Sequence, residues 1–125
     1  MLSIRGLCIS YGLFEALRGI SLEVNKGEIV CLIGSNGAGK STTLMTISGA
    51  VRPKDGDIIF EGERIVGIKP EEIVRRGISH VPEGRRIFPH LKVTENLEIG
   101  AYSVGAGRQK EISSGIKKIF DMFPV

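Results

Sequence analysis

The eight-residue segment GSNGAGKS, residues 34–41, constrains the fold of this chain more than any other feature. It matches the pattern GxxxxGK[ST] at every fixed position. The segment before it, residues 29–33, is apolar throughout, which is typical of a strand covered on both faces in a largely parallel sheet. The segment after it, residues 40–48, lacks proline and glycine and reads as a helix that Gly49 can end. The order strand, glycine-rich loop and helix predicts an α/β fold.

The residue types in this loop suit a phosphate group. Glycines at 34, 37 and 39 let backbone N–H groups turn inward into a concave anion site that a Cβ atom would obstruct. The helix that begins at Lys40 adds its positive end, and the lysine side chain can reach β- and γ-phosphates. The hydroxyl of Ser41 can ligate Mg²⁺ that bridges the same oxygens. We predict that residues 34–41 hold a nucleoside triphosphate with Mg²⁺.

The rest of the chain gives ordinary strand and helix signals. Leu17, Ile20, Leu22 and Val24 broadly alternate, which predicts an antiparallel strand near the start. The apolar stripe of the final predicted helix is assigned to core packing. The further predicted elements are a hairpin over 58–64, a helix over 70–76, a strand over 78–81, a short helix capped by Thr94 and running through Leu97, and a helix over 112–123 that Pro124 stops.

Composition describes an ordinary globular chain. The 125 residues fit one domain or part of one, and the net charge of +3 is spread along the chain, so we expect no nucleic-acid partner. Cys8 and Cys31 are expected to be buried, reduced thiols, and neither His80 nor His90 has the spacing of a metal or catalytic site. The longest apolar run is too short to span a bilayer, so the chain is expected to be cytoplasmic and not embedded in the membrane.

The segment GSNGAGKSTT closely resembles the Walker A segment of ABC-transporter ATPases. Tyr11 stands 23 residues before the loop, where this family places an aromatic side chain against the adenine ring. Taken alone, that tyrosine is better interpreted as a strand aromatic in the core. The resemblance implies that ATP is held by Tyr11, Gly34, Ser35, Asn36, Gly37, Ala38, Gly39, Lys40, Ser41 and Thr42, with Mg²⁺ at Ser41.

The segment HVPEGRRIFPHLKVTENL, residues 80–97, resembles the Q-loop region of the same family and is most like the ATP-binding subunits of branched-chain amino-acid importers. Glu83 stands where most of the family has glutamine, which implies a place near Mg²⁺ and the attacking water at a hinge. From the residue alone, a plain surface acid after a strand is the favoured interpretation. The resemblance implies a docking surface for a transmembrane partner, made of Arg85, Arg86, Phe88 and His90. From the residues alone, a solvated basic loop is an equally good interpretation.

The resemblance implies an incomplete ABC ATPase domain. Its P-loop NTPase core would be a mainly parallel sheet with flanking helices, joined to an antiparallel β subdomain. Residues 1–84 would form the amino-terminal part of this core with the Walker A loop, and residues 85–125 the Q-loop exit and the start of the helical subdomain. The sequence holds no LSGGQ signature, Walker B aspartate or switch histidine, so the resemblance covers the amino-terminal half of a family member.

The expected function is that of the ATP-binding subunit of an ABC importer, which energises uptake of branched-chain amino acids by ATP hydrolysis in the complete protein. Its partners would be transmembrane permease subunits, a second ATP-binding subunit and, indirectly, a substrate-binding protein, at the cytoplasmic face of the membrane. The alternatives are a nucleotide-binding fragment without turnover and a non-transport ABC ATPase. We expect this chain alone to be inactive, because only the phosphate-holding parts are visible.

Overall fold

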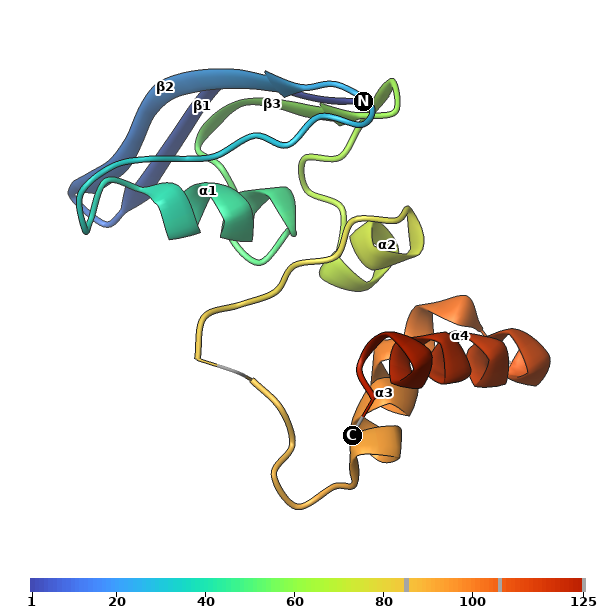
Figure 1. The fold of residues 1–125 in the computed structure, drawn as a ribbon. Coiled ribbons are helices and arrows are strands. Elements are labelled where there is room, and N and C mark those ends of the chain that lie inside the picture. Colours follow the sequence, from blue (N-terminus) through green and yellow to red (C-terminus); the bar gives the residue numbers. More distant parts are fainter. Residues whose placement is uncertain (85, 106, 125) are drawn as a thin grey trace. The chain divides into compact units, whose positions relative to one another are not determined.

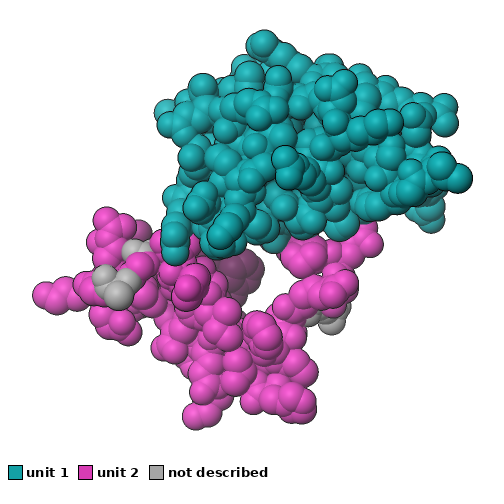
Figure 2. Space-filling view, turned by 180° about the vertical axis from the view of Figure 1, so that it is seen from behind, with its two compact units in different colours: residues 1–80 teal, residues 81–125 magenta. Residues whose placement is uncertain are grey.

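The chain forms two compact units, Met1–His80 and Val81–Val125 (Figure 2). The computed structural model describes residues 1–84, 86–105 and 107–124. The elements of the first unit are β1 (Leu2–Tyr11), β2 (Phe14–Val24), α1 (Lys40–Ile47), β3 (Asp55–Phe60), β4 (Glu63–Arg64) and α2 (Pro70–Arg75) (Figure 1). Those of the second unit are α3 (Val93–Gly100), η1 (Tyr102–Val104) and α4 (Gln109–Met122).

The first unit is built on an antiparallel sheet with the strand order β2-β1-β3-β4. Helix α1 lies against one face of this sheet (Figure 1). The core between them consists of the buried side chains of Ile4, Leu7, Ile9, Leu17, Ile58 and Ile65. The predicted antiparallel strand over 17–24, the helix after the glycine-rich loop and the hairpin over 58–64 are therefore confirmed.

A bulge in β1 sets which of its side chains face the core. Ile4, Leu7 and Ile9 are all buried, although strict alternation would send Ile4 and Leu7 to opposite faces. The pairing with β2 shifts register between Ile4 and Leu7, and Gly6 within this interval has φ of 58°. One extra residue in the strand restores the inward direction, which is the usual effect of a β-bulge.

The described part of the second unit contains helices and no strand, and α3 contacts α4. Helix α3 begins at Val93 rather than after Thr94, because Lys92 is the N-cap and its backbone N–H donates to Glu95 Oε2 at 2.6 Å. Helix α4 ends at Met122, before Pro124, as predicted, although it begins earlier than residue 112. Its apolar stripe is half-buried at Ile112, Ile116, Ile119 and Phe120 and exposed at Phe123.

Two predicted strands are not formed. Residues 29–33 and 78–81 have no strand pairing, and Ile29 and Ile33 are 91% and 95% exposed. Hydrophobicity alone cannot make a strand, because its N–H and C=O groups need a neighbouring strand, and no described segment bonds to the backbone of residues 29–33. The described sheet is accordingly antiparallel, and the parallel sheet predicted around this run is absent from the described residues.

The expectation of a buried thiol is wrong for Cys31, which belongs to the same exposed run. Both thiols are free, but Cys31 is exposed and Cys8 is half-buried. Cys31 lies in the unpaired segment 29–33, whose residues are all exposed. Within the ranges that the structure describes, no helix is long and apolar enough to cross a bilayer.

Candidate phosphate-binding site

The glycine-rich loop connects the apolar run to α1, and glycine is required at its different positions for different structural reasons. Gly37 and Gly39 have φ of 81° and 87°, a region that side chains with a Cβ rarely adopt. Gly34 does not have positive φ, but a Cβ there would lie 3.1 Å from the Cβ of Ala38. The backbone N–H of Ala38 donates to the Ser35 carbonyl at 3.2 Å, which closes a turn within the loop.

The carboxyl end of the loop is seated on the sheet. Gly39 is buried, and a Cβ at this position would lie 2.3 Å from Leu17 Cδ2 and 3.0 Å from the Ala16 carbonyl oxygen. No side chain fits in that space without displacing β2. The contact with β2 therefore fixes where the loop ends and where α1 begins.

Lys40 folds back over the loop that precedes it. Its Nζ donates to the carbonyl oxygens of Gly34 and Ser35, both at 2.8 Å. An ammonium group has three donors, so one remains after these two bonds. The two bonds hold the ammonium group at the loop, where it can bind an anion, and the side chain does not extend into solvent.

Helix α1 adds the field of its amino end at the same place. Lys40 is its first residue, and its first turn contains no acidic side chain that would compete with a bound anion. Ser41 is exposed, and Thr42 is half-buried. The loop and the helix end together provide cationic, amide and hydroxyl groups, a set that suits a polyphosphate with a divalent cation.

Thr43 is a supporting residue that the sequence reasoning missed. Its side chain is buried, and both its backbone N–H and its Oγ1 donate to the Gly39 carbonyl at 2.9 Å. This double contact ties the last residue of the loop to the first turn of α1. A threonine four residues after a loop glycine is the local signal, since threonine hydroxyls in helices commonly bond the carbonyl at i−4.

Tyr11 lies at the hairpin end of the sheet. It is the last residue of β1 and pairs with Phe14 across the turn to β2. Its side chain is 48% exposed, so the alternative of a buried core aromatic is wrong. Figure 1 shows this turn at the same end of the first unit as the start of α1, in agreement with the contact between Gly39 and Leu17.

Glu83 belongs to the second unit, whereas Tyr11 and the loop belong to the first. It is exposed in an irregular segment, and its carbonyl accepts a hydrogen bond from Arg86 Nε at 3.3 Å. Its role as metal ligand or catalytic group stays a prediction. No group of three potential metal ligands occurs among the described residues.

Residues 17–124 match the protein family described as ABC transporter. The chain belongs to the ABC transporter family. It is 44% identical over 124 residues to the high-affinity branched-chain amino acid transport ATP-binding protein BraG of Pseudomonas aeruginosa, covering 99% of this chain and 52% of BraG. It is 40% identical over 97 residues to the xylose/arabinose import ATP-binding protein XylG of Sulfolobus acidocaldarius, covering 78% of this chain and 39% of XylG.

A solved ATP-binding cassette of an ABC transporter shares the fold, with a TM-score of 0.83 and 28% identity over 97% of this chain and 53% of the cassette. The fold class is confirmed as a partial α/β domain with an antiparallel sheet, the amino-terminal part of an ABC ATPase domain. The chain spans about half the length of BraG and less of XylG.

The segment of this ABC-family chain that was expected to face a membrane partner is organised by Asn96, another residue that the sequence reasoning missed. Its Oδ1 accepts from the Phe88 N–H at 2.9 Å, and its Nδ2 lies within bonding distance of the carbonyls of Phe88, Leu91 and Lys92 at 3.1, 3.3 and 3.0 Å. Phe88 is left 53% exposed. Of the other residues proposed for this surface, Arg86 and His90 are exposed and Arg85 lies outside the described residues.

His80 has a structural contact in this chain. Its Nδ1 lies 3.3 Å from Ser48 Oγ, at the residue that caps the end of α1. This bond ties the last residues of the first unit to the helix that carries the loop. The absence of a metal or catalytic assignment for His80 and His90 stays a prediction.

Proposed function

We propose that residues 34–42 bind the triphosphate of ATP together with Mg²⁺. The observation that carries this proposal is the position of Lys40, whose ammonium group lies over the Gly34 and Ser35 carbonyls at the amino end of α1. The lysine would contact the β- and γ-phosphates, and the amides of residues 35–42 would surround the remaining oxygens. Ser41 would ligate Mg²⁺.

Tyr11 and Glu83 complete the proposed site. The exposed ring of Tyr11 is available to stack on adenine, because stacking needs only an accessible aromatic face. Glu83 would approach Mg²⁺ and the attacking water, as the residue that occupies the family's Q-loop position. A carboxylate there would be a charged metal ligand that repels the γ-phosphate unless the metal lies between them.

In the complete protein this site would serve an ABC importer that takes up branched-chain amino acids by hydrolysing ATP. The support is the 44% identity with BraG over nearly the whole chain, against 40% with XylG over a shorter part. The partners would be transmembrane permease subunits, a second ATP-binding subunit and, indirectly, a substrate-binding protein, at the cytoplasmic face of the membrane. Residues 1–84 would supply the nucleotide core, and residues 85–125 the Q-loop exit and the start of the helical subdomain.

Replacement of Lys40 by alanine tests the proposal. The change removes charge-assisted contacts to phosphate, so affinity for a fluorescent ATP analogue with Mg²⁺ should fall by about 10- to 150-fold. Lys26→Ala is the matched control, because Lys26 is an exposed lysine in the turn after β2 and lies outside the loop. Equal dissociation constants for the wild type and Lys40→Ala would refute the assignment of the loop.

The isolated chain is expected to bind ATP without turning it over. The loop and Lys40 contact ground state and transition state in similar ways, and such uniform binding does little for the chemical step. Phosphate release from monodisperse protein should equal the uncatalysed background. Turnover that is lost in Lys40→Ala but kept in Lys26→Ala would contradict this expectation and would make Glu83 the candidate base.

A further inference from the structure

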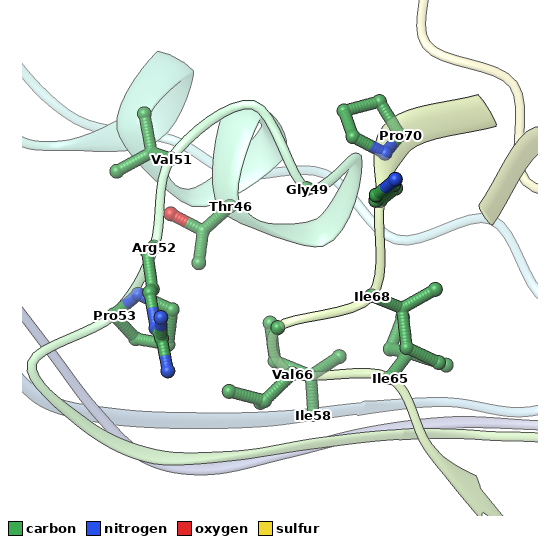
Figure 3. Close-up of a pocket in the computed structure, with 12 residues that line it drawn as sticks. Thr46, Gly49, Val51, Arg52, Pro53, Ile58, Ile65, Val66, Ile68 and Pro70 are labelled. Atoms are coloured by element: carbon green, nitrogen blue, oxygen red, sulfur yellow. The ribbon is translucent and has the colours of Figure 1, made fainter. Parts of the chain in front are cut away.

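The first unit contains a cavity of about 220 Å³ between the end of α1 and the segment that leads into α2 (Figure 3). None of its twelve lining residues belongs to the proposed ATP site, residues 34–42 or Tyr11. The cavity therefore needs a separate account.

Most of the cavity wall is aliphatic. Ile58, Ile65, Val66 and Ile68 form one side, and Ile58 and Ile65 are almost fully buried (Figure 3). Thr46 faces the cavity with its methyl group, because its Oγ1 donates to the Thr42 carbonyl at 2.7 Å. Such a wall favours a branched aliphatic group over water.

Two cations also line the cavity, Arg52 and Lys69, both with exposed side chains. No acidic residue lines it, and neither cation has an ion pair within the described parts of the chain. The backbone carbonyls of Thr46, Ile58 and Ile65 already accept hydrogen bonds from Gly49, Ile65 and Ile68. The cavity thus offers positive charge together with an aliphatic wall.

We propose that this cavity binds a small branched aliphatic monocarboxylate. The volume suits a small ligand, such as an acid of about six carbons. Its chain would lie on Ile58 and Ile65, and its carboxylate would be held by Arg52 and Lys69. An α-amino acid is expected to bind more weakly, because its ammonium group would lie beside these two cations. This site is independent of the proposed ATP site.

Titration of the ¹⁵N-labelled chain with 4-methylpentanoate tests the site. Saturable shifts should appear at amides around the cavity, such as those of Val51, Val66 and Ile68. We expect 4-methylpentan-1-ol and leucine to bind at least about 10-fold more weakly, since the first lacks the charge and the second adds an ammonium group. Equal binding of the alcohol or of leucine, or shifts centred on residues 34–41 instead, would overturn the proposal.

Two variants test separately the charge of the lining cations and the free volume of the cavity. Arg52→Gln with Lys69→Gln changes exposed side chains only and should weaken binding of the acid by about 10-fold or more. The matched control, Lys26→Gln with Arg75→Gln, removes the same charge from exposed residues outside the cavity and should leave binding unchanged. Val66→Phe should abolish binding by filling the cavity. Unchanged affinity in the Arg52 and Lys69 double variant would refute the charge-based recognition even if Val66→Phe fails to fold.

Discussion

Replacing Gly39 by alanine should destabilise the first unit through two separable effects. The residue has φ of 87°, and a left-handed conformation costs a residue with a Cβ about 1 to 2 kcal/mol. The new methyl would also lie 2.3 Å from Leu17 Cδ2 and 3.0 Å from the Ala16 carbonyl oxygen. Leu17 is only 5% exposed and cannot move into solvent, so overpacking should add about 1 to 3 kcal/mol. The expected loss is about 2 to 5 kcal/mol.

Gly37→Ala is the matched control for this prediction. Gly37 has φ of 81° in the same loop, but no atom lies within 4 Å of the position that a Cβ would take. It should therefore show only the conformational part, about 1 to 2 kcal/mol. Hydrogen exchange at core amides of β1 gives the free energy of opening of the sheet for both variants. Equal losses for Gly39→Ala and Gly37→Ala would refute the steric contact with β2.

A double-mutant cycle locates that contact. Leu17→Ala alone should cost about 2 to 5 kcal/mol, because it removes a buried core side chain. It also removes the atom that the Gly39→Ala methyl would meet. The two changes together should then cost less than the sum of their separate effects by about 1 kcal/mol or more. Strict additivity would place the cause of the Gly39→Ala effect elsewhere.

Two further predictions concern residues at the edges of the proposed site. Tyr11→Ala should lower the affinities for ATP and ADP by similar factors and leave the affinity for inorganic triphosphate unchanged, since stacking involves only the base. If the same titrations show a lower affinity for triphosphate as well, Tyr11 is a folding residue. Asn96→Ala should speed hydrogen exchange of the Phe88 amide by about 10-fold, because it removes the oxygen that accepts this N–H. Asn96→Asp keeps that acceptor and should leave the Phe88 amide better protected. Equal exchange rates in the wild type and Asn96→Ala would refute the role of Asn96.

The parts of the fold that the sequence predicts correctly are those set by local signals. Helix α1 follows from an uninterrupted run after the loop and a glycine behind it, and Gly49 indeed has φ of 77°. The hairpin over 58–64 follows from the turn residues at 61–62, because tight reversals depend on a few neighbouring residues. These signals need no knowledge of distant segments.

The incorrect predictions share a dependence on distant segments. Residues 29–33 have the composition of a buried strand, but a strand forms only where another backbone is available to pair with it. The bulge at Gly6 likewise depends on how β1 registers with β2, which alternation alone cannot reveal. Local reasoning therefore gave the phosphate loop and its helix, and it failed on the sheet around them.

The candidate site could be located from the sequence, but the way it is held together could not. The prediction treated the loop glycines as one group that admits inward-facing amides. The structure separates Gly39, which needs both its positive φ and its close approach to Leu17, from Gly34, which is crowded by Ala38. Thr43 donates to the Gly39 carbonyl from a buried position, and the threonine four residues after a loop glycine signals the bond but not the burial.

These contacts hold the two ends of the loop by different means. Its carboxyl end is fixed by Gly39 on β2 and by Thr43, whereas the carbonyls of Gly34 and Ser35 at its amino end are bonded by Lys40. A lysine that turns toward a phosphate gives up part of these carbonyl bonds, and phosphate bonds to the loop amides then take over the ordering of the same segment. Affinity lost in Lys40→Ala therefore has two physical origins. One is the missing charge at the phosphate, and the other is the cost of ordering an amino end that the lysine no longer holds before the nucleotide arrives.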